Sequence, residues 1–140
     1  MKDTYLVDNY SINCKGNLID LSTPKIMGII NTTPDSFYDG GKYNSIEKAI
    51  QKVEKDLSND ATFIDIGGHS TKPNAKEVSE DEELKRTIPI IEAIIKRFPN
   101  VLISIDTFRG KIAQEALLAG AAMINDISAW ELDKNMFNVI

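Results

Sequence analysis

Cysteine and histidine are almost absent from this sequence, since Cys14 and His69 are the only residues of their types among 140. A single cysteine forms no internal disulfide, and one cysteine with one distant histidine cannot supply the ligands of a zinc site. No run approaches the ~18 apolar residues of a membrane-spanning helix. The first ten residues lack the basic-then-apolar order of a signal peptide. We therefore expect a cytoplasmic protein with no disulfide, no zinc site and no membrane partner.

Basic residues are also in the minority. Lys and Arg total 16 against 21 Asp and Glu, which gives a formal charge of -5 and a pI near 4.9. This balance lacks the positive footprint of proteins that bind nucleic acid or an anionic membrane surface. We expect no nucleic-acid partner. A small anionic ligand stays open, because the field inside a cleft need not follow the net charge.

The chain is short for some folds but long enough for one core. Hydrophobic residues make up 42% of it and charged residues 26%, as in ordinary globular domains. A complete eight-stranded α/β barrel takes about 250 residues. If the strands described next belong to a barrel, 140 residues supply only part of it.

Strand and helix patterns alternate along the chain. Residues 11–21 (SINCKGNLIDL) alternate around a turn cluster and predict a short β-hairpin. The later elements are expected as a strand at Lys25–Ile30 buried on both faces, a helix through Ile46–Leu57, a strand at Ala61–Ile66, a helix through Leu84–Ile95, a strand at Val101–Ile105, a helix through Ile112–Leu117 and a strand at Ala121–Ile124. This alternation favours a parallel sheet of an α/β protein, either doubly wound or a barrel.

Local signals mark several helix ends. These are the capping-box pairs Asn44/Glu47 and Ser79/Glu82, the stop at Phe98-Pro99 and the terminal Gly120. Apolar residues from Met136 to Ile140 indicate a further helix beginning. The core strands are expected from residue 25 onward.

Polar side chains stand at the carboxyl end of each predicted core strand, at Asn31, Asp65, Asp106 and Asn125. In parallel α/β folds, ligands bind at the carboxyl ends of the strands. Each residue has a structural alternative: Asn31 as a turn former, Asp65 as a satisfied core carboxylate, and Asp106 or Thr107 as a helix cap. Four together favour a ligand site, because a ring of buried polar groups is costly without partners. Carboxylate and amide groups suit a planar heterocycle with N–H donors and acceptors.

At this point the motifs resemble those of the dihydropteroate synthases, folate-pathway enzymes of the pterin-binding family. The match rests on MGIINTTPDSF at 27–37 with DGG at 39–41, FIDIGG at 63–68 with STKP at 70–73, ISIDT at 103–107 and INDI at 124–127. The first motif is long and specific, whereas the last two are shared with other pterin-binding barrels. The resemblance covers nearly the whole chain and implies a TIM (β/α)8 barrel, of which residues 1–140 are the N-terminal part with about the first four βα units.

The resemblance also implies a reaction and its residues. The family condenses 6-hydroxymethyl-7,8-dihydropterin diphosphate with 4-aminobenzoate to give 7,8-dihydropteroate and diphosphate, with Mg²⁺. Carried over by motif, the matching positions are Asn31 for the metal, Asp106 and Asn125 for the pterin ring, Thr71 and Lys72 for substrate contacts, Pro73 for the aminobenzoate pocket and Phe37 for closing over that pocket.

The sequence departs from the family pattern in the second loop and in its extent. Lys72 stands where Arg is usual, which keeps the charge but loses the bidentate fork, and Asn74 and His69 also differ. The family's later Lys-x-x-Arg-x-His pattern does not occur in these 140 residues. We therefore expect little or no turnover from this chain alone, and an open sheet edge at the fourth core strand.

Two other readings stay open. One is a methyltetrahydrofolate-binding methyltransferase domain, which shares the pterin-contacting Asp and Asn but not the first loop. The other is a non-catalytic pterin-binding half-barrel that pairs with itself as a homodimer or with a separate C-terminal half.

Overall fold

The computed structural model describes residues 10–32, 42–69 and 78–140. The elements, in chain order, are β1 (Ser11–Cys14), β2 (Asn17–Asp20), β3 (Ile26–Asn31), α2 (Lys42–Ser58), β4 (Ala61–Gly67), α3 (Glu80–Arg97), β5 (Leu102–Asp106), α4 (Gly110–Ala119), β6 (Met123–Asn125) and the 3₁₀ helix η1 (Lys134–Asn138). The predicted order of elements is confirmed.

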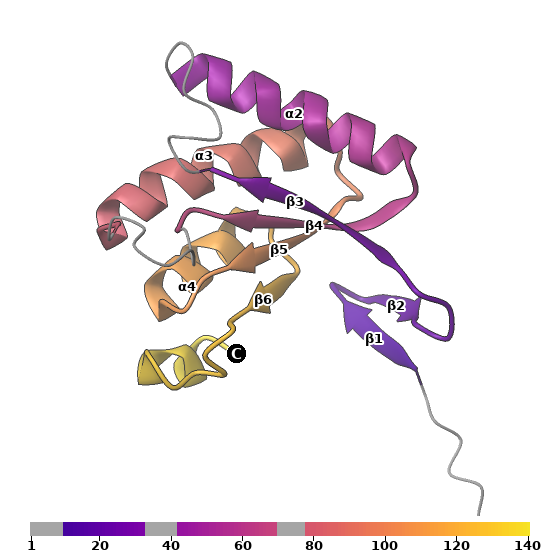
Figure 1. Ribbon diagram of the computed structural model, residues 1–140. Helices are drawn as coiled ribbons and strands as arrows, with labels where there is room; N and C mark the ends of the chain where they lie inside the picture. Colours follow the sequence, from indigo (N-terminus) through magenta and orange to yellow (C-terminus); the bar gives the residue numbers. More distant parts are fainter. Residues whose placement is uncertain (1–9, 33–41, 70–77) are drawn as a thin grey trace, which may run out of the picture.

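Two sheets are present in the part of the chain that the structure describes. β1 and β2 form an antiparallel hairpin, as predicted. The other four strands form a parallel sheet in the order β3-β4-β5-β6, so neighbours in sequence are neighbours in space (Figure 1). This sequential order is that of a barrel wall and not of a doubly wound sheet, whose order reverses at a switch point.

Helices α2, α3 and α4 cover one face of the parallel sheet (Figure 1). Every second strand residue points to that face and packs against these helices to form the main core. The fully buried members contributed by the strands are Ile30, Ile64, Ile66, Ile103 and Ile105. These β-branched side chains fit a pleated surface, which explains why the sequence favours strands here.

The opposite face, which we call the helix-free face, carries the alternate residues of the same strands. Near the amino ends of the strands, Phe63 and Leu102 are buried there against Cys14 of the hairpin, with Ile12 and Ile19 packed around them. Lys15 at the hairpin turn donates a hydrogen bond of 2.9 Å to the carbonyl oxygen of Gly120. The hairpin therefore covers only the amino-terminal end of this face.

The first core strand differs from its prediction. We expected residues 25–30 to be buried on both faces, yet Ile26 is 55% exposed and Ile29 56%. The reason is that β3 pairs only with β4 and forms an edge of the sheet. The expected open edge at the fourth strand is present but spans only three residues, so the longer open edge is that of β3.

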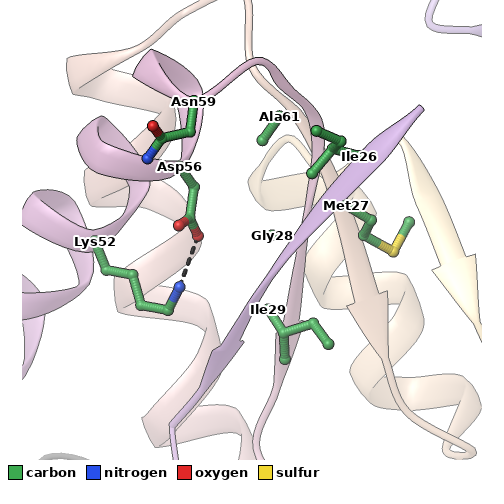
Figure 2. Close-up of a pocket in the computed structure, with 8 residues that line it drawn as sticks. All are labelled: Ile26, Met27, Gly28, Ile29, Lys52, Asp56, Asn59 and Ala61. Carbon is green, nitrogen blue, oxygen red and sulfur yellow. Dashed lines mark hydrogen bonds and ion pairs between the residues drawn. The ribbon is translucent and has the colours of Figure 1, made fainter. Parts of the chain in front are cut away.

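A pocket of about 330 Å³ lies along this β3 edge (Figure 2). Lys52 and Asp56 of α2 form an ion pair of 2.7 Å beside the strand. A Cβ atom added at Gly28 would lie 2.5 Å from Oδ2 of Asp56, so a larger residue there would require the Asp56 side chain to move. The pocket lies at the strand edge, away from the carboxyl ends of the strands.

Helix ends agree with the local signals at three of four places. Ser79 caps α3 by accepting a hydrogen bond from the Glu82 amide at 3.3 Å, and Phe98 follows its last turn. Gly120 ends α4 in the left-handed region, with φ of 115°. The Asn44 capping box is wrong, because α2 begins two residues earlier, at Lys42.

The carboxyl-terminal elements also need correction. The last strand runs over Met123–Asn125 and not over Ala121–Ile124, because its pairing with β5 begins only at Met123. The helix expected from Met136 is a short 3₁₀ helix. Asp133 caps this helix by accepting from the Asn135 amide at 3.0 Å, and it also accepts from the Gly110 amide at 2.8 Å.

Candidate functional site

Three of the predicted site residues lie in one row at the carboxyl ends of the strands. The strand register pairs Asn31 with Gly67, Gly67 with Asp106, and Asp106 with Asn125. These three residues and Gly67 therefore lie side by side on the helix-free face, and we call the four residues the upper row. The parallel pairing of four strands brings together residues almost a hundred positions apart in sequence.

Gly67 makes room for the Asp106 side chain within this row. A Cβ atom added at Gly67 would lie 3.3 Å from Oδ2 of Asp106, which is tighter than ordinary contact. The carboxylate of Asp106 therefore leans over the neighbouring strand. The predicted helix-cap role of Asp106 or Thr107 is wrong, because the N-cap of α4 is Arg109 and Asp133 accepts from the first amide of the helix.

Asp65 lies one step deeper than predicted. We expected it at the end of its strand, but β4 continues to Gly67, so Asp65 faces Ser104 in a second row beneath the upper row. Asp65 is 6% exposed. Its Oδ2 accepts a hydrogen bond of 3.3 Å from Nδ2 of Asn125, while Oδ1 is buried with no partner among the described residues. Among the described residues, Asp65 is therefore only partly satisfied as a core carboxylate.

The acidic surroundings change the titration of Asp106. Partial burial, followed by the negative charges of Asp65, Glu83 and Asp126, raises the pKa of the Asp106 carboxyl from 3.8 to about 6. A proton or an N–H donor from a ligand relieves this unfavourable concentration of negative charge. The upper row is thus suited to a ligand edge that donates hydrogen bonds.

A buried ion pair supports the loop that follows Asp106. Glu83 of α3 is completely buried and accepts from Nη1 of Arg109 at 2.5 Å and from the Thr107 hydroxyl at 2.8 Å. Nη2 of Arg109 donates to the carbonyl oxygen of Val78 at 2.6 Å. Because a buried carboxylate must be paired, this network fixes the β5–α4 loop against α3. Sequence reasoning missed it, because Glu83 looks like one more acidic residue of a first helical turn.

His69 lies at the start of the second loop. Its ring meets the Phe108 ring edge-on at 5.7 Å, so this half-buried histidine packs against the β5–α4 loop. The predicted site residues Phe37, Thr71, Lys72 and Pro73 lie outside the described residues.

Metal and membrane features were searched over residues 10–32, 42–69 and 78–140. No group of three or more His, Cys, Asp or Glu side chains is arranged there to hold a metal ion. None of the helices in these ranges is both long and apolar enough to cross a membrane. The oxygen of the Asn31 side chain, at the exposed end of β3, is a hard ligand of the kind that Mg²⁺ accepts. Mg²⁺ keeps several waters and needs few protein ligands when a substrate phosphate supplies the others, so this donor fits the ion.

Comparison with known proteins decides the family. The sequence pattern described as pterin binding enzyme matches residues 27–140. The chain belongs to the pterin-binding enzyme family. Both the resemblance inferred from the motifs and the barrel fold class are confirmed by this match and by the structural neighbours.

Individual members of the pterin-binding family are similar over most of the chain. A dihydropteroate synthase of Haemophilus influenzae is 53% identical over 111 residues, which cover 79% of this chain and 40% of the relative. The structure of Xanthomonas albilineans dihydropteroate synthase with 4-aminobenzoic acid superposes with a TM-score of 0.84 at 38% identity, covering 93% of this chain and 48% of that one. Burkholderia cenocepacia dihydropteroate synthase complexed with 7,8-dihydropteroate gives a TM-score of 0.76 at 36% identity, covering 92% and 42%. The chain thus spans less than half the length of each relative.

Proposed function

We propose that the protein to which this chain contributes is a dihydropteroate synthase, which joins 6-hydroxymethyl-7,8-dihydropterin diphosphate to 4-aminobenzoate. The single observation that carries the proposal is the Asp106–Asn125 pair, which lies above a buried oxygen of Asp65 that has no partner among the described residues. Its relatives support it, since a neighbour carries 7,8-dihydropteroate and another carries 4-aminobenzoic acid.

The pterin ring suits the upper row on chemical grounds. Its pyrimidine edge bears an amino group and a ring N–H beside an acceptor, and these complement a carboxylate and a carboxamide. Asp106 accepts from the donors of this edge, and Asn125 offers both an acceptor and a donor. The raised pKa of Asp106 indicates that its charge is poorly compensated in the free protein. Hydrogen bonds from N–H donors of the ligand to this carboxylate are therefore stronger than the same bonds in water.

Other residues of the motifs are proposed to bind the remaining parts of the substrates. We propose Asn31 as the protein ligand of Mg²⁺, which when bound would neutralise charge on the departing diphosphate. Lys72 is proposed to contact the diphosphate, Thr71 a substrate, Pro73 the aminobenzoate, and Phe37 to close over it. In the overall reaction, the amine nitrogen of 4-aminobenzoate bonds to the pterin methylene carbon, the carbon–oxygen bond to diphosphate breaks, and the amine loses a proton.

The chain's own contribution to this reaction is orientation and electrostatics. The upper row fixes the pterin at the carboxyl ends of the strands, and the Glu83–Arg109 pair holds the adjoining loop in place. We propose that the protein acts in the cytoplasm, where the unpaired Cys14 thiol stays reduced. A homodimer is proposed as its protein partner.

Isothermal calorimetry of this chain with 6-hydroxymethylpterin tests the proposal. We expect saturable binding that is lost in Asn125→Ala and kept in Arg97→Met, a matched control in an exposed ion pair remote from the site. Absence of binding by a folded chain would refute the proposed pterin site. Formation of 7,8-dihydropteroate from both substrates with Mg²⁺ measures the activity, for which we expect little turnover by this chain alone.

A further inference from the structure

Two buried polar atoms on the helix-free face have no partner among the described residues: Oδ1 of Asp65 and Oγ of Ser104. The strand register places these two residues opposite each other, beneath the upper row. An unpaired buried carboxylate oxygen costs far more than an unpaired hydroxyl, because the charge is removed from water. Asp65 therefore lowers the stability of the fold, so stability does not explain why an aspartate stands at this position. A role in the binding site is the alternative explanation.

The other oxygen of Asp65 makes one contact, and it reaches across a strand. Oδ2 on β4 accepts from Nδ2 of Asn125 on β6 at 3.3 Å, with β5 between the two strands. A carboxylate only accepts hydrogen bonds, so the contact is compatible with one orientation of the Asn125 amide. In this orientation the amide nitrogen points to Asp65, and the amide oxygen is left for a ligand.

We propose that Asp65 is a positioning residue that holds the Asn125 amide with its oxygen toward the ligand. This inference rests on the proposed function and deepens it, because it assigns the part of the ligand that Asn125 meets: an N–H donor of the pterin edge. Without Asp65 the amide is free to turn over, and its N–H groups then oppose the N–H donors of the ring. Asp65 thereby favours heterocycles whose edge donates hydrogen bonds, and it disfavours those whose edge only accepts them.

The first test needs no ligand. The side-chain amide signals of Asn125 in a ¹H–¹⁵N correlation spectrum are assigned by their loss in Asn125→Ala. We expect Asp65→Asn to shift these signals, because the charged acceptor is gone. Ser104→Ala, a substitution in the same buried row, should leave them in place. Asn125 signals that do not respond to Asp65→Asn overturn the proposal, and Asp65→Ala serves as the second variant if Asp65→Asn does not fold.

The second test is a double-mutant cycle on 6-hydroxymethylpterin affinity. The loss of one oriented hydrogen bond predicts about a 10-fold weaker Kd for Asp65→Asn. In an Asn125→Ala background the same substitution should have almost no further effect, because the group that it positions is absent. Fully additive losses overturn the positioning role. If the unsubstituted chain binds no pterin, the proposed function fails, and the amide spectrum alone decides whether Asp65 orients Asn125.

Discussion

Asp106→Asn should make the folded chain more stable at neutral pH and at the same time weaken its pterin site. Asparagine has nearly the same shape as aspartate but carries no charge. Among the described residues no group donates a hydrogen bond to the Asp106 carboxylate, so the substitution breaks no native contact there. It removes a charge that lies partly buried among the charges of Asp65, Glu83 and Asp126.

The size of the effect follows from the pKa. Burial and neighbouring carboxylates raise the pKa of Asp106 from 3.8 to about 6. A shift of one pKa unit corresponds to about 1.4 kcal/mol, which sets an upper limit of about 3 kcal/mol on the change in unfolding free energy. Because the side chain is only about half removed from water, solvent screening reduces this limit, and we expect a gain of about 1–2 kcal/mol.

The pH dependence has a definite sign. The carboxyl is protonated more readily in the folded chain than in the unfolded chain, so folding is favoured at low pH and this advantage is lost as the pH rises toward 6. The difference in unfolding free energy between Asp106→Asn and the unsubstituted chain should therefore be largest above about pH 7. It should decline steadily as the pH falls through 6 and 4 and be nearly gone at about pH 3, below the unfolded value of 3.8, where the carboxyl is largely neutral in both states.

Urea denaturation of both chains at a series of pH values measures this difference, and the other titrating groups cancel in the comparison. A variant that is less stable at neutral pH, or a difference that does not change with pH, would refute the reasoning. Calorimetry on the same two chains should show pterin affinity falling by about 10- to 100-fold, the usual worth of a hydrogen bond to a charged group. If the variant is stabilised but still binds the pterin with full affinity, Asp106 does not contact the pterin.

Two further predictions concern the support of the site, both measured by urea denaturation. Arg109→Met should cost about 3–5 kcal/mol, because it leaves the completely buried Glu83 carboxylate without its charged partner. Arg97→Met, which breaks an ion pair whose side chains are both 61% exposed, should cost less than about 0.5 kcal/mol, and equal costs would contradict the assignment. Ser79→Ala should cost about 1 kcal/mol by removing the N-cap of α3, whereas an unchanged midpoint would show that the cap contributes nothing.

Much of the secondary structure was predictable because its signals are local. The hairpin turn at Lys15-Gly16, the cap at Ser79 and the left-handed Gly120 each depend on a few neighbouring residues. The strands were recognisable as short apolar runs between turn residues. Errors occurred where pairing decides, at the bounds of β6 and at the exposed surface of β3, because an edge strand has the same composition as a central one.

The site divides in the same way. The sequence by itself determined which polar residues follow the strands, and its motifs indicated the pterin-binding family, because both are properties of contiguous segments. Only the tertiary structure decided that Asp65 lies below Asn125 and contacts it across 60 residues of sequence. The physical reason is that depth on a sheet face is set by register, and register depends on how distant strands pair. The same pairing concentrates the negative charges that raise the pKa of Asp106, which no single segment of the chain contains.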